Sequence, residues 1–248
     1  TTTISTSTLS NGEMIRWKVT ATDTADGSSR QPQFPDRFDS PEYFGTIAED
    51  PSLARSNLPV FHWFTSSPGG ANTTNGSRGS VYFLGQFYDN IQADRHGQST
   101  GGFPKKSYDF DFNKGDRFRY RDGEARVKDL NMLTNWADKS KTRNTLGYEI
   151  VNRAGEPAHF AFPVRIQQNA AFFSTADLVE DGDERYLERV GLDGEGALYK
   201  MYNRLDSSTS GVNKKTRKNE NNSDLQALVS GLSQSGDAKL RYGYDNID

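Results

Sequence analysis

The sequence predicts an α+β fold built mainly from strands, and three observations support this. Aromatic residues make up 12% of the chain although hydrophobic residues reach only 33%, and a core built from Phe and Tyr favours sheets. Several short runs alternate apolar and polar side chains, which is the period of a strand with one buried face. Three other stretches have the spacing of short helices. We therefore expect an antiparallel sheet with a few helices.

The N-terminal part of the chain is expected to lie outside the main domain. Ile15 and Trp17 alternate with polar residues before a turn-rich segment, which predicts one strand. One strand cannot bury its face alone, so residues 1–31 are interpreted as the end of an upstream β-sandwich-like domain or as an edge strand of the main domain. Residues 32–57 are rich in proline and predict an extended connector. The main domain is expected over residues 58–248.

The main domain alternates between patterns typical of strands and of helices. Strands are expected over 58–64, 81–91, 108–112, 160–180 with a turn at 167–170, and 197–205, and half of a second hairpin is expected over 111–120 with its turn at 113–116. Helices are expected over 141–154 with Thr142 or Ser140 as the cap and Gly155 as the stop, over 183–191, and over 225–232 with Asp224 as the cap. Residues 206–224 are polar and predict a solvated loop.

Composition excludes several classes of protein. The net charge of −3 is too balanced for nonspecific binding to nucleic acid or to a membrane surface. The chain has no cysteine, which excludes a disulfide scaffold, a zinc site with cysteine ligands and a thiol nucleophile. No segment approaches the roughly 20 apolar residues that span a bilayer, and the Thr-rich start lacks the features of a signal peptide. We therefore expect neither nucleic acid nor membrane insertion.

The most informative stretch, RHGQSTGGFPKKSYDFDF, covers residues 95–112. Its glycines allow the backbone to approach a ligand closely, and Lys105 and Lys106 place two ammonium groups at the start of an alternating strand. This arrangement is suited to holding a phosphate. The alternative is a hairpin with a basic edge that discourages aggregation.

Two possible metal sites are not supported by the spacing of their residues. His62, His96 and His159 share no ligand spacing, and His62 is interpreted as a hydrogen-bonded core residue. Residues 177–188 place Asp177, Asp181, Gly182 and Glu188 at calcium-loop positions one, five, six and twelve. However, Val179 occupies the third ligand position, and a strand is expected to enter the loop where a calcium hand has a helix.

Four stretches in register carry a resemblance to a known family. They are FPKKSYDFDF (103–112), LNMLTNWADKSKTRNTLGYEI (130–150), FFSTADLVEDGDERYLERVG (172–191), and GALYK (196–200) followed by KKT (214–216). In this order they resemble the spore-coat CotH kinase family, in the versions found inside large secreted bacterial proteins. The resemblance covers roughly residues 58–232.

The resemblance implies an atypical protein-kinase-like fold, of which this chain would form the N-terminal lobe. It also implies that ATP and a divalent metal such as Mg²⁺ are bound, and that the terminal phosphoryl group passes to Ser or Thr of a partner protein. A secreted or cell-surface location would follow. Partners would be the nucleotide and either a protein substrate or neighbouring domains of a larger chain.

The resemblance also implies roles for particular residues. Phosphoryl transfer needs cations on the phosphates, and the family's PKKSY lysines correspond to Lys105 and Lys106. The acidic residue that ends the strand before the helix at 183–191 corresponds to Glu180, which would pair with the lysine or serve as an exposed acid at a helix start. Tyr199 and Lys200 would lie near the adenine, with core packing as the alternative for Tyr199. Arg143 and Asn144 would orient a helix.

Two departures from the family pattern limit what is expected of this chain. The glycine turn reads RHGQSTGG where the family has a form such as RGRGNSSW, so direct phosphate cradling by that loop is in question. The family's metal-binding and catalytic aspartates lie in NWD and WDxD motifs, and residues 236–248 have no such form. No metal ligand or catalytic base is therefore assigned, and the chain is expected to be an incomplete kinase. The rival interpretation is a noncatalytic adhesion or assembly module of a large extracellular protein.

Overall fold

The computed structural model describes residues 3, 5, 8–30, 39–202, 204–207 and 211–247. The chain forms two compact units, Thr1–Asp181 and Gly182–Asp248, and each is described by itself. The fold is a mixture of strands and a few helices, as expected. Part of the predicted connector, residues 32–38, lies outside the described residues.

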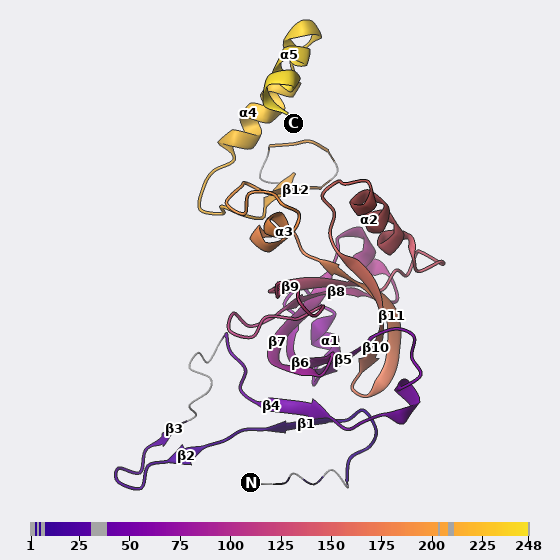
Figure 1. Ribbon diagram of the computed structural model, residues 1–248, viewed down its shortest axis with the longest axis vertical. Coiled ribbons are helices and arrows are strands. Elements are labelled where there is room, and N and C mark those ends of the chain that lie inside the picture. The colour runs from indigo at the N-terminus through magenta and orange to yellow at the C-terminus, as the bar shows by residue number, and fades with distance from the viewer. Residues whose placement is uncertain are drawn as a thin grey trace. The chain divides into compact units, whose positions relative to one another are not determined.

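The first unit is built on a closed barrel of seven strands (Figure 1). They are β5 (Val60–Thr65), β6 (Ser77–Phe83), β7 (Gln86–His96), β8 (Ser107–Asp111), β9 (Asp129–Leu133), β10 (Ala161–Gln168) and β11 (Ala171–Glu180). Their order around the barrel is β10-β11-β9-β8-β7-β6-β5. All neighbours are antiparallel except β10 and β5, which run parallel and close the barrel.

The alternating pattern of the sequence puts the large rings inside this barrel. Phe61, Trp63 and Phe110 are completely buried, and the ring centroids of Trp63 and Phe110 lie 5.2 Å apart in an edge-to-face contact. The prediction of a purely antiparallel sheet is corrected by the parallel pair of β10 and β5. Closure removes the free edges that an open sheet would have to protect.

Three strand predictions differ from the structure. The segment 81–91 is divided between β6 and β7 by a turn at Leu84 and Gly85, which have φ values of 45° and 78°. The turn expected at 113–116 is present, but the half-hairpin expected over 111–120 has only one isolated bridge, between Phe118 and Val127, after that turn. Strand β9, which the sequence did not predict, follows this bridge and completes the barrel wall.

The described residues of the first unit include two α-helices. The short α1 (Pro68–Ala71) lies in the β5–β6 connection, and α2 (Arg143–Arg153) confirms the predicted helix. The expected side-chain cap is corrected, because Thr142 makes no capping hydrogen bond. Asp138 accepts from the backbone N–H of Arg143 instead. Gly155, with φ of 89°, follows the helix as predicted.

Outside the barrel the first unit has short antiparallel ribbons. Strand β1 (Met14–Trp17) pairs with β4 (Phe44–Ile47), β2 (Ala21–Thr22) pairs with β3 (Ser29–Arg30), and a 3-10 turn spans Pro51–Leu53. The segment expected to be a connector thus contains β4. The buried carboxylate of Asp89 on β7 accepts from the backbone N–H groups of Glu42 and Tyr43, which fixes the β1–β4 ribbon to the barrel.

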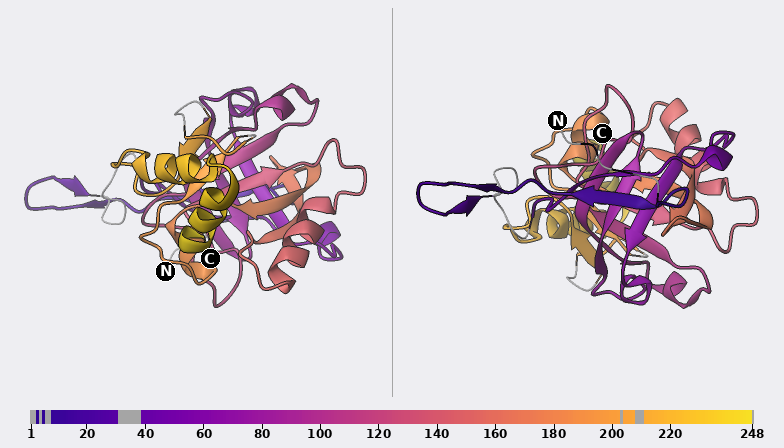
Figure 2. Two further views of the ribbon diagram at one scale, coloured as in Figure 1. Left: turned by 90° about the horizontal axis from the view of Figure 1, so that it is seen from above. Right: turned by 90° about the horizontal axis from the view of Figure 1, so that it is seen from below.

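In the described part of the second unit, the regular secondary structure is mainly helical, with one short pair of strands. It contains α3 (Glu184–Arg189), β12 (Tyr199–Met201), β13 (Val212–Lys214), α4 (Ser223–Leu232) and α5 (Gly236–Asn246). Helices α4 and α5 pack together (Figure 2). Gly231 allows this, because an added Cβ would lie 2.2 Å from the ring of Tyr242.

The structure confirms the helices predicted at 183–191 and 225–232, but it differs from the prediction in the cap of the second helix and in the segments on either side of it. Asn222 occupies the cap position of α4, and Asp224 lies inside the first turn. Strand β13 lies within the predicted loop, and α5 was not predicted at all. Within the described residues, no helix combines the length and the apolar character needed to cross a membrane.

Candidate functional site

Lys105 lies two residues before the start of β8, close to the predicted position, and its side chain reaches across to β11. The Nζ donates to the carbonyl oxygen of Phe173 at 2.8 Å and lies 5.3 Å from the centroid of that ring. Among the described residues it forms no ion pair with a carboxylate. Burial, together with the nearby Lys141 ammonium, lowers the pKa of Lys105. This is a partly desolvated cation held by a neutral acceptor, which favours an incoming anion.

A polar cluster lies near Lys105 at the end of β9 and the start of α2, where the hydroxyl of Thr134 donates to the backbone carbonyl of Lys105 at 3.3 Å. Asn135, with φ of 49°, donates from Nδ2 to Asp177 at 2.6 Å and accepts from Asn144 on Oδ1 at 2.8 Å. Its backbone carbonyl accepts from Lys141. Asp177 is 1% exposed, and burial raises its pKa. Sequence reasoning missed Asn135 and Lys141 as members of a site, because nothing in their spacing marks a left-handed turn.

Lys106 has a different environment from its neighbour. Its Nζ donates to the carbonyl oxygens of Gly101 at 2.6 Å and Phe103 at 2.7 Å. Both acceptors belong to the turn that precedes β8, which includes a 3-10 segment at Ser99–Gly102. Lys106 therefore holds the glycine-rich turn closed against the start of the strand.

Glu180 ends β11, as predicted, but it does not pair with either lysine. Its carboxylate accepts from the backbone N–H of Phe160 at 3.3 Å and lies 3.7 Å from Nδ1 of His159. Phe173, which holds Lys105, is seven residues away on the same strand, or roughly 23 Å at about 3.3 Å per residue. Glu180 is only 3% exposed, so the alternative of an exposed helix-start acid is also incorrect.

Tyr199 belongs to the second unit, where its ring and its hydroxyl both make contacts. The hydroxyl donates to Asp224, and Nζ of Lys214 lies 5.1 Å from the ring centroid. Burial and Asp224 raise the pKa of Tyr199. Lys200 is exposed, on the opposite side of β12.

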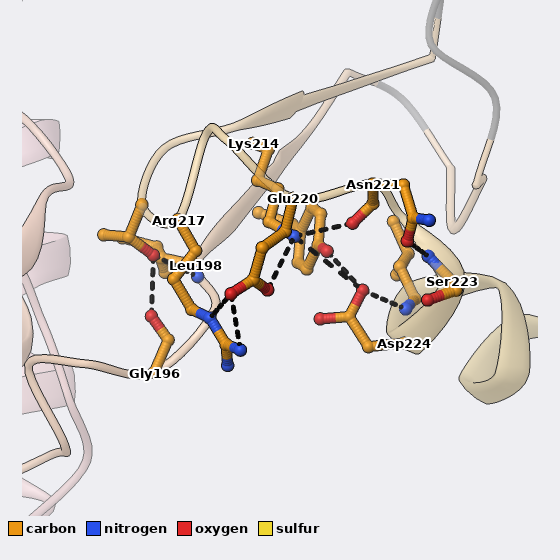
Figure 3. Close-up of polar contacts among 11 residues, drawn as sticks. Gly196, Leu198, Lys214, Arg217, Glu220, Asn221, Ser223 and Asp224 are labelled. Atoms are coloured by element: carbon orange, nitrogen blue, oxygen red, sulfur yellow. Dashed lines mark hydrogen bonds and ion pairs between the residues drawn. The ribbon is translucent and has the colours of Figure 1, made fainter.

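Lys214 is the centre of the polar contacts drawn in Figure 3. Its side chain is only 8% exposed, and its Nζ donates to the carbonyl of Asn221 at 2.7 Å. The carboxylates of Glu220 and Asp224 each lie 4.0 Å away. The lysine-rich segment that the sequence marked as a solvated loop thus joins β13 to the start of α4.

The remaining residues singled out by the sequence have structural contacts. Arg143 lies 3.5 Å from Asp138, and Asn144 bonds to Asn135, which agrees with a role in orienting α2. His62 is buried as expected, and burial lowers its pKa to about 4. The expected hydrogen bond is not found at its Nδ1, which has no partner among the described residues. His96 contacts Asp109 at 2.6 Å.

The residues of the calcium-loop pattern are spread over different elements. Asp177 lies within β11, and Glu188 pairs with Arg185 at 2.9 Å on α3. Within the described part of the chain, no three His, Asp or Glu side chains gather as a metal site.

Comparison with known proteins now places these features in a family. The family described as CotH kinase protein matches residues 94–246. This range begins shortly before the turn that contains Lys105 and Lys106, and it includes β8 to α5. A search of the curated proteins finds no match to the chain. The match covers more than half of the sequence, and it includes the four stretches that carry the resemblance. The chain therefore belongs to the CotH kinase protein family.

Proposed function

We propose that the chain is an ATP-dependent protein phosphotransferase of the CotH-like class, in which the barrel unit serves as the N-terminal lobe of the kinase. Family membership supports this proposal, and the environment of Lys105 is the observation on which it depends. A cation without a carboxylate partner, in a partly buried position beside a second lysine, is what a nucleotide phosphate requires. A secreted or cell-surface location belongs to the same proposal.

The residues present fit the phosphates of a nucleotide better than they fit the metal. Lys105 and Lys141 bring two ammonium groups together, whereas the described residues contain no gathered set of three metal ligands. Bound ATP would supply the phosphoryl group for transfer to a Ser or Thr hydroxyl. Lys105 would hold the phosphates in place, and we assign no metal ligand and no catalytic base.

Nucleotide-dependent thermal stabilisation tests this function. At ten times Kd, a ligand adds about 1.4 kcal/mol to the free energy of unfolding, which is about 3–5 °C for a chain of this size. We expect millimolar ATP with magnesium to raise the Tm of the wild type, and Lys105→Ala to lose most of that rise. Lys105→Arg should retain part of it, because the charge remains.

Lys106→Ala is the matched control. It removes a neighbouring ammonium that is committed to the turn, so its Tm without ligand should fall while the rise with ATP persists. An equal rise in Lys105→Ala would remove Lys105 from the site. If ATP leaves the wild type unchanged, the noncatalytic adhesion module becomes the better description.

A further inference from the structure

The first unit has a cavity between the β1–β4 ribbon and the barrel, and neither Lys105 nor Lys106 lines it. Its volume is about 730 Å³, which is within the range of small-molecule sites. The ribbon supplies Trp17, Tyr43 and Phe44, and the start of β7 supplies Phe87 and Gln86. Lys114 and Asp116, from the loop after β8, complete the rim.

The walls of this cavity are held in place before any ligand arrives. The Trp17 and Phe44 rings stack with centroids 6.3 Å apart. Gly45 of the ribbon lies so close to Phe87 that an added Cβ would be 2.3 Å from that ring. Asp89 fixes the ribbon through two backbone N–H groups at 3.0 Å. A preformed wall lowers the entropy lost on binding.

The charges around the cavity have both signs and therefore favour a neutral ligand. Asp39 and Asp116 contribute negative charge at the rim, and Lys114 contributes positive charge. The guanidinium of Arg16 and the ammonium of Lys18 already lie 4.8 Å and 5.7 Å from the centroid of the Tyr43 ring. These cations oppose a cationic ligand in an aromatic cage, and the rim carboxylates oppose a phosphate or another anion.

The polar groups at the rim include both donors and acceptors. The side-chain amide of Gln86 and the ammonium of Lys114 have no hydrogen-bond partner among the described residues. Asp39 uses Oδ1 to accept from the backbone N–H of Lys114 at 2.9 Å. A ligand that offers hydroxyl groups can satisfy both kinds of partner, while its apolar face covers the rings.

We propose that this cavity binds a neutral saccharide, with the ring C–H faces of one or two sugar units on Trp17, Phe44 and Phe87 and with hydroxyl groups on Gln86, Lys114 and Asp116. This is a binding site separate from the phosphate contact at Lys105. It would attach the chain to a glycan surface regardless of whether phosphoryl transfer takes place.

Affinity electrophoresis with the full chain tests this inference. Native gels would contain one neutral polysaccharide each, namely hydroxyethylcellulose, xyloglucan, galactomannan, mixed-linkage β-glucan or mannan, with a plain gel as reference. We expect at least one of them to retard the wild type, and Trp17→Ala to weaken that binding at least tenfold. Trp136→Ala is the matched control, because Trp136 is 47% exposed and does not line the cavity.

Gln86→Ala provides a second test that does not depend on the ribbon packing. It removes one side-chain amide and keeps the backbone of β7, so the fold should persist while affinity falls several-fold. Lys105→Ala should bind the polysaccharide as the wild type does. The proposal is overturned if no neutral polysaccharide retards the wild type, or if both Trp17→Ala and Gln86→Ala are retarded as strongly as the wild type.

Discussion

Lys105 and Lys106 are adjacent in the sequence and have different roles in the structure. Lys105 crosses to a carbonyl of β11, whereas Lys106 folds back onto two carbonyls of its own turn. Successive side chains at the start of a strand point in opposite directions, so the two ammonium groups do not act as a pair. A double substitution would therefore mix a change in the proposed site with a change in the turn.

A second residue-scale feature is the tight turn between β10 and β11. Asn169 and Ala170 have φ values of 49° and 65°, so both central residues of the turn are left-handed. Such hairpin turns favour Asn followed by Gly. Alanine in this conformation is strained by roughly 1 kcal/mol.

We expect Ala170→Gly to raise the free energy of unfolding by about 0.5–1 kcal/mol, because glycine relieves the strain at a small cost in chain entropy. Urea unfolding followed by fluorescence would measure the change. Ala171→Gly is the matched control one residue later, within β11, and it should lower stability instead. A loss of stability in Ala170→Gly would show that packing of the Ala170 methyl group, which lies 3.5 Å from the position of a Cβ added at Gly12, outweighs the strain.

At the scale of elements, the outer face of β7, β8 and β9 carries opposed carboxylates. Asp94 lies directly across from Asp109, and Asp111 lies directly across from Asp129. Like charges in these positions are destabilising. Burial, followed by the hydrogen bond with Asp111, raises the pKa of Asp129 to about 7, although Lys128 lies 3.0 Å away and opposes this shift.

The raised pKa of Asp129 makes the barrel less stable as pH rises. The folded chain holds the proton more tightly than the unfolded chain, in which the pKa is about 3.9. The contribution to stability is therefore complete below about pH 4 and is lost as pH rises through about 7, at about 1.4 kcal/mol per unit of pKa difference. We expect Asp129→Asn to reduce the fall in urea midpoint between pH 5 and pH 8.

Asp138→Asn is a control of opposite sign for this experiment. The hydrogen bond with Ser140 lowers the pKa of Asp138 to about 2, so its stabilising effect is complete above about pH 4 and is lost as pH falls through 2. Replacing it should lower the midpoint by the same amount at pH 5 and pH 8. If the urea midpoint of Asp129→Asn falls between pH 5 and pH 8 as much as that of the wild type, the Asp111–Asp129 pair does not share a proton near neutral pH.

At the scale of the whole molecule, the two units differ in how much core they contain. The first unit has the large aromatic cluster of the barrel. In the described part of the second unit, the buried apolar side chains are Leu187, Val212 and Leu225. All three tryptophans, Trp17, Trp63 and Trp136, belong to the first unit.

This distribution predicts that two probes will report different unfolding curves. Tryptophan fluorescence follows the first unit alone, whereas helical circular dichroism also follows α4 and α5. Because a smaller core is less stable, we expect the dichroism change to begin at lower urea concentration than the fluorescence change. Coincident curves would show that the two units unfold as one cooperative structure.

Much of the local structure could be predicted from the sequence. Local patterns of neighbouring residues predicted strands β5, β8, β10 and β11 and helices α2, α3 and α4. They also predicted that Lys105 lies before β8. The strands that were missed, among them β4, β9 and β13, are short. The apolar residues of β9 and β13 do not stand out from the polar segments around them. Helix α5 escaped prediction because its apolar side chains, including Leu240 and Tyr244, are 73% and 90% exposed.

The sequence by itself determined the family, the strand-rich fold class and the place of the lysines at the start of a strand, because periodicity and turn chemistry are local. The tertiary structure decided the closure of the barrel through β5 and β10, the separation of Lys105 from Glu180, and the cavity beside Trp17. Each of these depends on residues about 40 to 105 positions apart in the chain meeting in space. A one-dimensional pattern does not specify such meetings, because they are set by the packing of the whole barrel.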